Sequence, residues 1–263
     1  MQLRKQITTL VVILFSVTII YGKDIKLCGV EWPPFTYVEN NFIVKGISYE
    51  IYEHAFHLLG KRFIAHKIPW PRCRNYVKKG EYDAIIDADT LEFIIGTFPT
   101  SFYPVGVYTR FDFPEDKFSW DLVRGKRIGM IRGHKYTDII GNFNNWIKDF
   151  ASNEIMMIQK LKANRYDFII SDLFAAHYFA KTVGIKIKML KPILDFGPNY
   201  LAFNRDRKKL LKDYDKIIGL MIQDGTLDRI YLKYLPYSYS ELKKMASKPL
   251  DPVPLDHFHL PNL

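Results

Sequence analysis

The amino-acid sequence predicts an α/β protein built from two similar lobes. Short apolar segments typical of buried strands alternate with helical segments, the order that gives parallel sheets covered by helices. The segment 79–87, KGEYDAIID, is echoed by 163–172, ANRYDFIISD, so a helix end, a Tyr-Asp pair, a buried strand and an acidic residue recur. Helix–turn–strand units often look alike, which is the alternative explanation. We interpret the repeat as two lobes facing a cleft, because open α/β sheets bind ligands at the carboxyl ends of their strands.

The first 22 residues have the pattern of a secretory signal. Arg4 and Lys5 precede a mostly apolar run over 7–20, and Gly22 precedes the polar residue Lys23. The run is shorter than the roughly 20 apolar residues that span a bilayer, so a cleaved signal is favoured over a membrane anchor. We therefore predict cleavage after Gly22 and a mature protein located in the periplasm.

The composition is that of a globular protein. Hydrophobic residues make up 48% of the 263 residues and aromatic residues 15%, which is enough for a substantial core and argues against disorder. The formal net charge of +10 raises nucleic acid and membrane surfaces as partners. The charges are scattered, however, and the densest cluster, 205–209, is interrupted by Asp206. We expect no nucleic-acid partner.

The chain has two cysteines, Cys28 and Cys73. In an exported protein such a pair forms a disulfide or stays as two buried thiols, and the sequence leaves both alternatives open. Two cysteines without clustered histidines make a poor zinc site, so we expect no metal.

The elements of the first part of the chain follow from local patterns. A strand at 24–30 leads into Trp32-Pro33-Pro34-Phe35, where the paired prolines must turn the chain. Apolar residues at 3–4 spacing predict a helix over 46–59, which Gly60 ends. The next predicted elements are a strand at 62–68, a helix at 72–79 and a buried strand at 82–86.

The second part repeats this alternation. Asp172 is a good N-cap for a helix over 172–182, and Gly225 divides two later helices. Four prolines after residue 247 predict an extended surface arm. The predicted strands are 125–131, 166–171, 185–190 and 200–204, and the predicted helices lie near 136–140 and over 154–163, 172–182, 208–224 and 227–234.

Several of these segments resemble the bacterial extracellular solute-binding proteins of family 3, the polar amino acid type. The resemblance runs over nearly all of 24–235, and it rests on the order and spacing of its motifs. These are Trp32-Pro33-Pro34-Phe35 with Gly46, Trp70-Pro71-Arg72, GEYDA at 80–84, LVRGKRIG at 122–129, NRYD at 164–167 followed by Ser171-Asp172, and Gly225-Thr226-Leu227. The resemblance implies a periplasmic-binding-protein type II fold, in which two hinge strands join two α/β lobes around a ligand cleft.

The resemblance also implies how the chain divides. We expect a discontinuous first lobe at 24–108 plus 199–238, a second lobe at 109–198, and a Pro-rich C-terminal tail at 239–263. The bends would lie near 108–111 and 196–199, where a few residues absorb lobe closure.

Some candidate ligand-binding residues follow the strands of the first lobe. Trp32 and Phe35 would wall off a ligand, or else belong to the core, and Trp70 stands near the same edge. Asp87 and Asp89 follow the predicted strand at 82–86, where two carboxylates favour a cationic group on the ligand. Their alternative role is in a cap or a solvated turn.

The sequence departs from the family at one position that matters. Amino acid binders of the family place an arginine after this strand to grip the α-carboxylate of the ligand, and 90–99 contains no arginine. Arg72 and Arg132 could compensate, with His134 and Tyr136 adding hydrogen bonds, or both arginines could simply be surface charges.

In the second lobe, Asp172 matches the family residue that holds the ammonium group of the ligand. Its alternative is to cap the following helix, and the two roles are compatible.

These residues predict a periplasmic solute-binding protein. It would capture a small polar, amino-acid-like or cationic ligand by lobe closure and, as a monomer without cofactors, deliver it to a membrane transporter permease of ABC type. We expect no enzymatic activity, since neither a nucleophile elbow nor a phosphate or dinucleotide loop is present in the sequence. The alternatives are a periplasmic enzyme similar to cyclohexadienyl dehydratases, for which Asp87, Asp89 and Glu92 are available, and a ligand-sensing partner of a membrane receptor.

Overall fold

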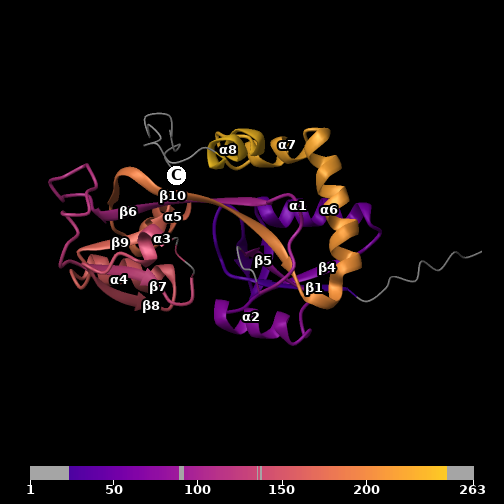
Figure 1. Cartoon of the computed structure of the whole chain (residues 1–263), viewed down its shortest axis with the longest axis horizontal. Coiled ribbons are helices and arrows are strands. Elements are labelled where there is room, and N and C mark those ends of the chain that lie inside the picture. The colour runs from indigo at the N-terminus through magenta and orange to yellow at the C-terminus, as the bar shows by residue number, and fades with distance from the viewer. Residues whose placement is uncertain (1–23, 89–91, 135, 137, 248–263) are drawn as a thin grey trace, which may run out of the picture.

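The computed structural model describes residues 24–88, 92–134, 136 and 138–247. These residues form two α/β lobes joined by two long strands (Figure 1), which confirms the predicted fold class. No helix within the described ranges is long and apolar enough to cross a membrane. The predicted signal at 1–22, Asp89 and the Pro-rich segment from residue 248 lie outside the described residues.

The first lobe is built on a sheet with a parallel centre. Strand β1 pairs in parallel with β4 and β5, while β2 and β3 form an antiparallel edge beside β4. The edge hairpin was not predicted, because it is short and half exposed. The elements are β1 (Ile25–Gly29), β2 (Tyr37–Glu39), β3 (Phe42–Lys45), α1 (Ile47–Leu58), β4 (Phe63–Lys67), α2 (Trp70–Lys78) and β5 (Ala84–Ala88).

The second lobe repeats this design. Strand β7 lies between β8 and β9 and is parallel to both, so the carboxyl ends of all three strands face the same way. The edge strand β8 was not predicted. The elements are β7 (Arg127–Ile131), α3 (Asp138–Gly141), β8 (Ile147–Ala151), α4 (Glu154–Lys162), β9 (Phe168–Asp172) and α5 (Ala175–Val183).

Two antiparallel strands connect the lobes. Strand β6 (Ser101–Arg110) pairs with β10 (Ile187–Phe203) along nearly its whole length. Strand β10 is one long strand where the sequence predicted two, and β6 was not predicted at all. Since β6 already pairs with β9 of the second lobe at Val105–Tyr108, we propose that the chain changes lobe at 101–104, earlier than the expected bend near 108–111.

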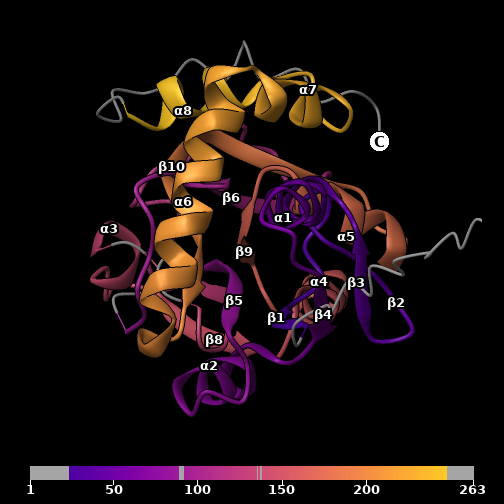
Figure 2. The same cartoon turned by 90° about the vertical axis from the view of Figure 1, so that its right-hand side faces the viewer.

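Three helices at the C-terminal end cover the first lobe and the connecting strands: α6 (Lys208–Gln223), α7 (Thr226–Leu232) and α8 (Tyr239–Ala246) (Figures 1 and 2). A short 3-10 turn, Arg205–Arg207, precedes α6. Helix α8 occupies a segment that was expected to belong to the tail. A capping box of Ser238 and Glu241 starts this helix, Leu242 is buried, and the Tyr239 hydroxyl donates to the Pro99 carbonyl at 3.1 Å.

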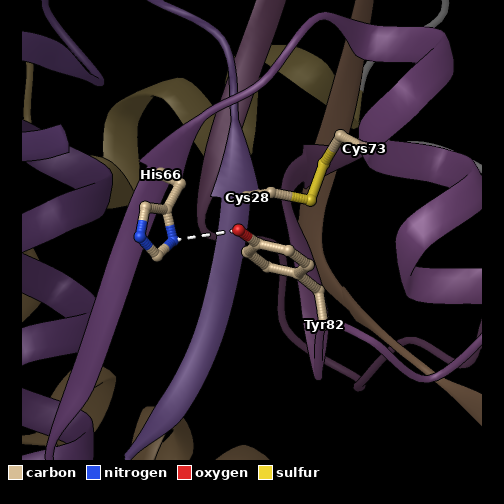
Figure 3. The surroundings of a disulfide bond; sticks show 4 residues. All are labelled: Cys28, His66, Cys73 and Tyr82. Atoms are coloured by element: carbon tan, nitrogen blue, oxygen red, sulfur yellow. Dashed lines mark hydrogen bonds between the residues drawn. A yellow bond between two sulfur atoms is a disulfide. The ribbon is translucent and has the colours of Figure 1, made fainter. Parts of the chain in front are cut away.

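The cysteines form a disulfide. Cys28 on β1 is bonded to Cys73 on α2, with Cα atoms 5.8 Å apart (Figure 3). Beside it, the Tyr82 hydroxyl and His66 Nδ1 share a hydrogen bond of 3.1 Å. The cross-link therefore ties α2 to the sheet and fixes the start of this helix, where Trp70 lies.

Candidate functional site

A cavity lies between the two lobes. It is reached by the carboxyl ends of β5, β7 and β9, by the segment that follows β1, and by both connecting strands, as expected for ligand sites of open α/β sheets. The residues around it are Val30, Trp32, Thr36, Trp70, Ile86, Asp87, Tyr103, Ile131, His134, Glu154, Met157, Ile170, Ser171, Asp172 and Asn199. Five predicted site residues are among them: Trp32, Trp70, Asp87, His134 and Asp172.

The turn after β1 is held in place by its contact with α1. Backbone N–H groups of Ile47 and Ser48 donate to the Pro34 and Phe35 carbonyls, each at 3.0 Å. Gly46 makes this approach possible, because its φ is +118° and a Cβ there would lie 2.3 Å from the Phe35 carbonyl oxygen. The motif of paired prolines and a later glycine therefore positions Trp32.

Trp32 and Asp172 meet across the cleft. The indole Nε1 of Trp32, from the first lobe, donates to Oδ2 of Asp172, from the second, at 2.9 Å. Both residues are buried, with exposed fractions of 8% and 3%. This hydrogen bond joins the two lobes directly, so the described arrangement is a closed one.

Asp172 ends β9 and its side chain binds the start of α5, although the N-cap residue of that helix is Phe174 and not Asp172 as predicted. Its Oδ1 accepts the backbone N–H groups of Phe174 and Ala175 at 2.8 and 3.0 Å. Burial raises the pKa of Asp172 to about 6, although these N–H groups and the Trp32 indole act in the opposite direction. One side chain thus accepts N–H groups at the start of α5 and also lines the cavity.

Asp87 stands on the first-lobe side of the cavity. Its carboxylate accepts hydrogen bonds from Ser48 and Ser101 at 2.8 Å and from the Tyr52 hydroxyl at 3.1 Å. Burial raises the pKa of Asp87 to about 6, and the three hydroxyls partly counteract it. The residue has a φ of +53°, a conformation that costs energy for a residue other than glycine.

Glu154 is a third carboxyl at the cavity, which the sequence reasoning missed. It is the first residue of α4 and lies shortly after the end of β8 at Ala151, whereas Asp172 is the last residue of β9. Burial raises its pKa to about 7, helped by the charges of Asp172 and Glu31, whereas a hydrogen bond from its own backbone N–H and the Lys67 charge act in the opposite direction. Recognition of 147–151 as a strand would have been the signal, because it places Glu154 at a strand's carboxyl end.

Aromatic rings complete the walls. Trp70 from the first lobe and His134 from the second lie edge to face, with ring centroids 6.0 Å apart. Burial lowers the pKa of His134 to about 4, so this ring is neutral at pH 7. Tyr103, also missed because β6 was not predicted, lies 5.8 Å from Trp32.

Four predicted site residues lie elsewhere. Phe35 is fully buried in the core, stacked 4.3 Å behind Trp32. Arg72 is exposed, and Arg132 is an exposed residue beside an outer groove at the cleft mouth. Tyr136 packs in the second lobe, where its hydroxyl accepts the Ile131 N–H at 2.7 Å. Local sequence could not show these directions, since neighbouring side chains on a turn or helix point to different sides.

Three carboxyls thus surround the cavity, and its described lining contains no lysine or arginine. No group of His, Cys, Asp or Glu side chains within the described ranges has the arrangement of a metal site. The chemistry of the site favours a ligand with positive charge.

The pH dependence of stability should report Glu154. A carboxyl whose pKa is raised on folding binds more protons in the native state than in the unfolded state, so its ionisation destabilises the fold as pH rises. We expect Glu154→Gln to be as stable as wild type near pH 4.5 and to become more stable than wild type as pH rises. The gain should reach roughly 1 to 3 kcal/mol of unfolding free energy by pH 8. Urea unfolding at several pH values measures this difference, and a constant difference would contradict the assignment.

The fold is that of a two-lobed protein of the periplasmic-binding-protein type, with a cavity between the lobes. No protein-family model matches the chain. A segment of 82 residues is 39% identical to the L-cystine-binding protein TcyK of Bacillus subtilis. This match covers 31% of this chain and only 30% of the length of that relative.

Solved structures match over most of the chain. A putative L-cystine ABC transporter protein from Listeria monocytogenes has a TM-score of 0.70 at 22% identity, covering 84% of this chain and 100% of that one. An arginine transport periplasmic binding protein from Legionella pneumophila has a TM-score of 0.69 at 24% identity, covering 81% and 100%. A histidine kinase sensor domain with similarity to periplasmic binding proteins has a TM-score of 0.71 at 16% identity, covering 82% and 97%. The solved structures confirm the predicted fold, and the match to TcyK shows that one segment of 82 residues is similar to a cystine-binding protein.

Proposed function

We propose that this protein is a periplasmic solute-binding protein that captures a small polar ligand with a cationic group between its lobes. It delivers the ligand to the membrane permease of an ABC-type uptake system. The observation that carries the proposal is the cavity between the lobes, closed by the Trp32–Asp172 hydrogen bond and surrounded by three carboxyls. The names of the cystine- and arginine-binding relatives support it.

Closure and binding are coupled through these carboxyls. In an open arrangement water solvates them, whereas in the closed one burial raises the pKa values of Asp87, Glu154 and Asp172. A cation in the cavity compensates the buried negative charge. The ligand therefore stabilises the closed form more than the open one, which is the condition for a ligand to drive closure.

We further propose that the protein acts as a monomer and performs no chemistry on its ligand. Asp172 is engaged by three donors and Asp87 by three hydroxyls, which suits fixed charges better than proton shuttles. Glu92, available to the enzymatic alternative, forms an ion pair with Arg74 at 2.8 Å and does not line the cavity. Recovery of the bound ligand unmodified after prolonged incubation, checked by mass spectrometry, tests this point, and a new product would favour the enzyme.

A ligand screen tests the central proposal. A ligand at 100 times its Kd adds about 2.7 kcal/mol of stability, which raises Tm by roughly 5–11 °C for a protein of this size. We expect such a shift with a cationic solute, together with a smaller radius of gyration in small-angle scattering. A ligand that binds without altering lobe separation would contradict capture by closure. Uptake of that solute by cells with and without the gene separates transport from a sensory role.

A further inference from the structure

We propose that the ligand is a small organic ammonium ion that carries no carboxylate group. This inference rests on the proposed function and narrows its substrate class. It follows from what the groups around the cavity can still bind once their mutual contacts are made.

The donors best suited to a carboxylate are already occupied. Backbone N–H groups at the start of a helix are favourable anion sites, and at α5 two of them, from Phe174 and Ala175, donate to Asp172. At α4, the Asn153 side chain accepts the Met156 N–H at 2.9 Å. The Trp32 indole also donates to Asp172. An acidic ligand group would have to displace these internal partners.

Positive side chains lie outside the cavity. Arg72 and Arg132 are exposed, and the described residues that line the cavity include no arginine or lysine. Lys67 lies at the outer groove, where it forms an ion pair of 3.2 Å with Glu31. A ligand carboxylate inside the cavity would therefore face three carboxyls, while the nearest described cation that acts on them, Lys67, reaches Glu154 only from the outer groove.

The same lining is well suited to an ammonium ion. Glu154 and Asp172 are close enough to interact electrostatically, and no described lysine or arginine pairs with either in the cavity. The rings of Trp32, Trp70 and Tyr103 stand around the same space, and aromatic faces attract cations. Asp87, on the opposite lobe, offers a second negative group for a ligand with two ammonium groups.

Matched pairs of probes test the inference. Putrescine and ornithine, cadaverine and lysine, and agmatine and arginine differ only in the carboxylate, while choline and glycine betaine form a quaternary pair. Isothermal titration calorimetry at pH 7.5 on the full mature chain gives each Kd. We expect at least one acid-free member to bind at least 10-fold more tightly than its partner, and the pairs distinguish diammonium, ammonium–guanidinium and quaternary ammonium ions.

A charge variant ties this preference to the site. Glu154→Gln removes the negative charge and keeps the shape of the side chain. We therefore expect it to raise the Kd of the tightest-binding cation at least 10-fold. The exposed Glu115→Gln serves as the matched control and should leave the Kd unchanged. A melting curve establishes that each variant is folded. The titrations of wild type with the probe pairs test the inference even if a variant fails to fold.

The outcomes separate this inference from the proposed function. Equal or tighter binding of the amino acid in every pair overturns the inference while leaving capture by closure intact. Binding of no probe also overturns it, and the solute that co-purifies with the protein then decides the proposed function. If no solute induces closure, both fail.

Discussion

Replacing Asp172 by asparagine is expected to weaken ligand binding at least 100-fold and to leave the unliganded protein at least as stable as wild type at pH 7.5. The loss follows because a buried carboxylate that faces a cation contributes a charge-assisted interaction, which a neutral amide cannot supply. The Oδ1 atom of asparagine can still accept the N–H groups of Phe174 and Ala175, so the start of α5 is preserved.

The effect on stability has the opposite sign. The pKa of Asp172 is raised from 3.8 to about 6, which corresponds to about 3 kcal/mol of destabilisation of the folded state once the group is ionised. The variant removes this penalty and loses the Trp32 hydrogen bond, which is worth about 1–3 kcal/mol when a buried donor is left unpaired. The gain should appear between pH 4 and 6 and stay constant above pH 7.

Calorimetric titration and urea unfolding measure the two effects separately. Asp121→Asn, at an aspartate whose side chain is 88% exposed, is the matched control and should change neither. A variant that binds as tightly as wild type would remove Asp172 from the binding site. A variant that is several kcal/mol less stable would assign it a purely structural role.

Removing the disulfide is the second change with a large expected effect. The bond between Cys28 and Cys73 closes a loop with a sequence separation of 45 residues. The chain-entropy model gives about 4 kcal/mol for a loop of this length, equivalent to a fall in Tm of roughly 8–16 °C. The double variant Cys28→Ala/Cys73→Ala should therefore melt well below wild type.

Ligand binding should suffer much less. Helix α2 also packs against the sheet through Val77, and the Asn204 side chain donates to the Val77 carbonyl at 2.6 Å, so Trp70 should stay near the cavity. We expect less than a 10-fold rise in Kd below the melting temperature. Reductant should lower the Tm of wild type and leave the double variant unchanged. A fall in Tm below 2 °C would show that the cross-link contributes little to stability.

The sequence predicted the strands and helices whose pattern is local and strong. Helix α1 was expected at 46–59 and lies at Ile47–Leu58, and the two segments in the internal repeat became β5 and β9. The missed strands have weaker patterns. Strand β6 contains Pro104 and Gly106, which argue against a central strand. The structure accommodates Pro104 because the pairing of β6 with β9 begins only at Val105, one residue later.

The missed site residues have the same origin. Tyr103 lies on the unpredicted β6, and Glu154 begins the helix that comes after the unpredicted β8. Conversely, Arg72 and Arg132 were placed at the correct strand and helix ends but are exposed. Position in an element could be predicted, whereas the direction of the side chain required the packing of both lobes.

The sequence by itself determined the α/β class, the two related lobes and the two aspartates, Asp87 and Asp172, at strand ends. These features depend on residue periodicity and on the short-range chemistry of turns and caps. The tertiary structure alone decided that Trp32 bonds to Asp172 across the cleft, that Cys28 bonds to Cys73, and that Glu154 joins the cavity. Such contacts join residues far apart in the chain, so no local pattern encodes them. Burial between the lobes also raises the pKa values of Glu154 and Asp172, and this burial exists only once both lobes are packed.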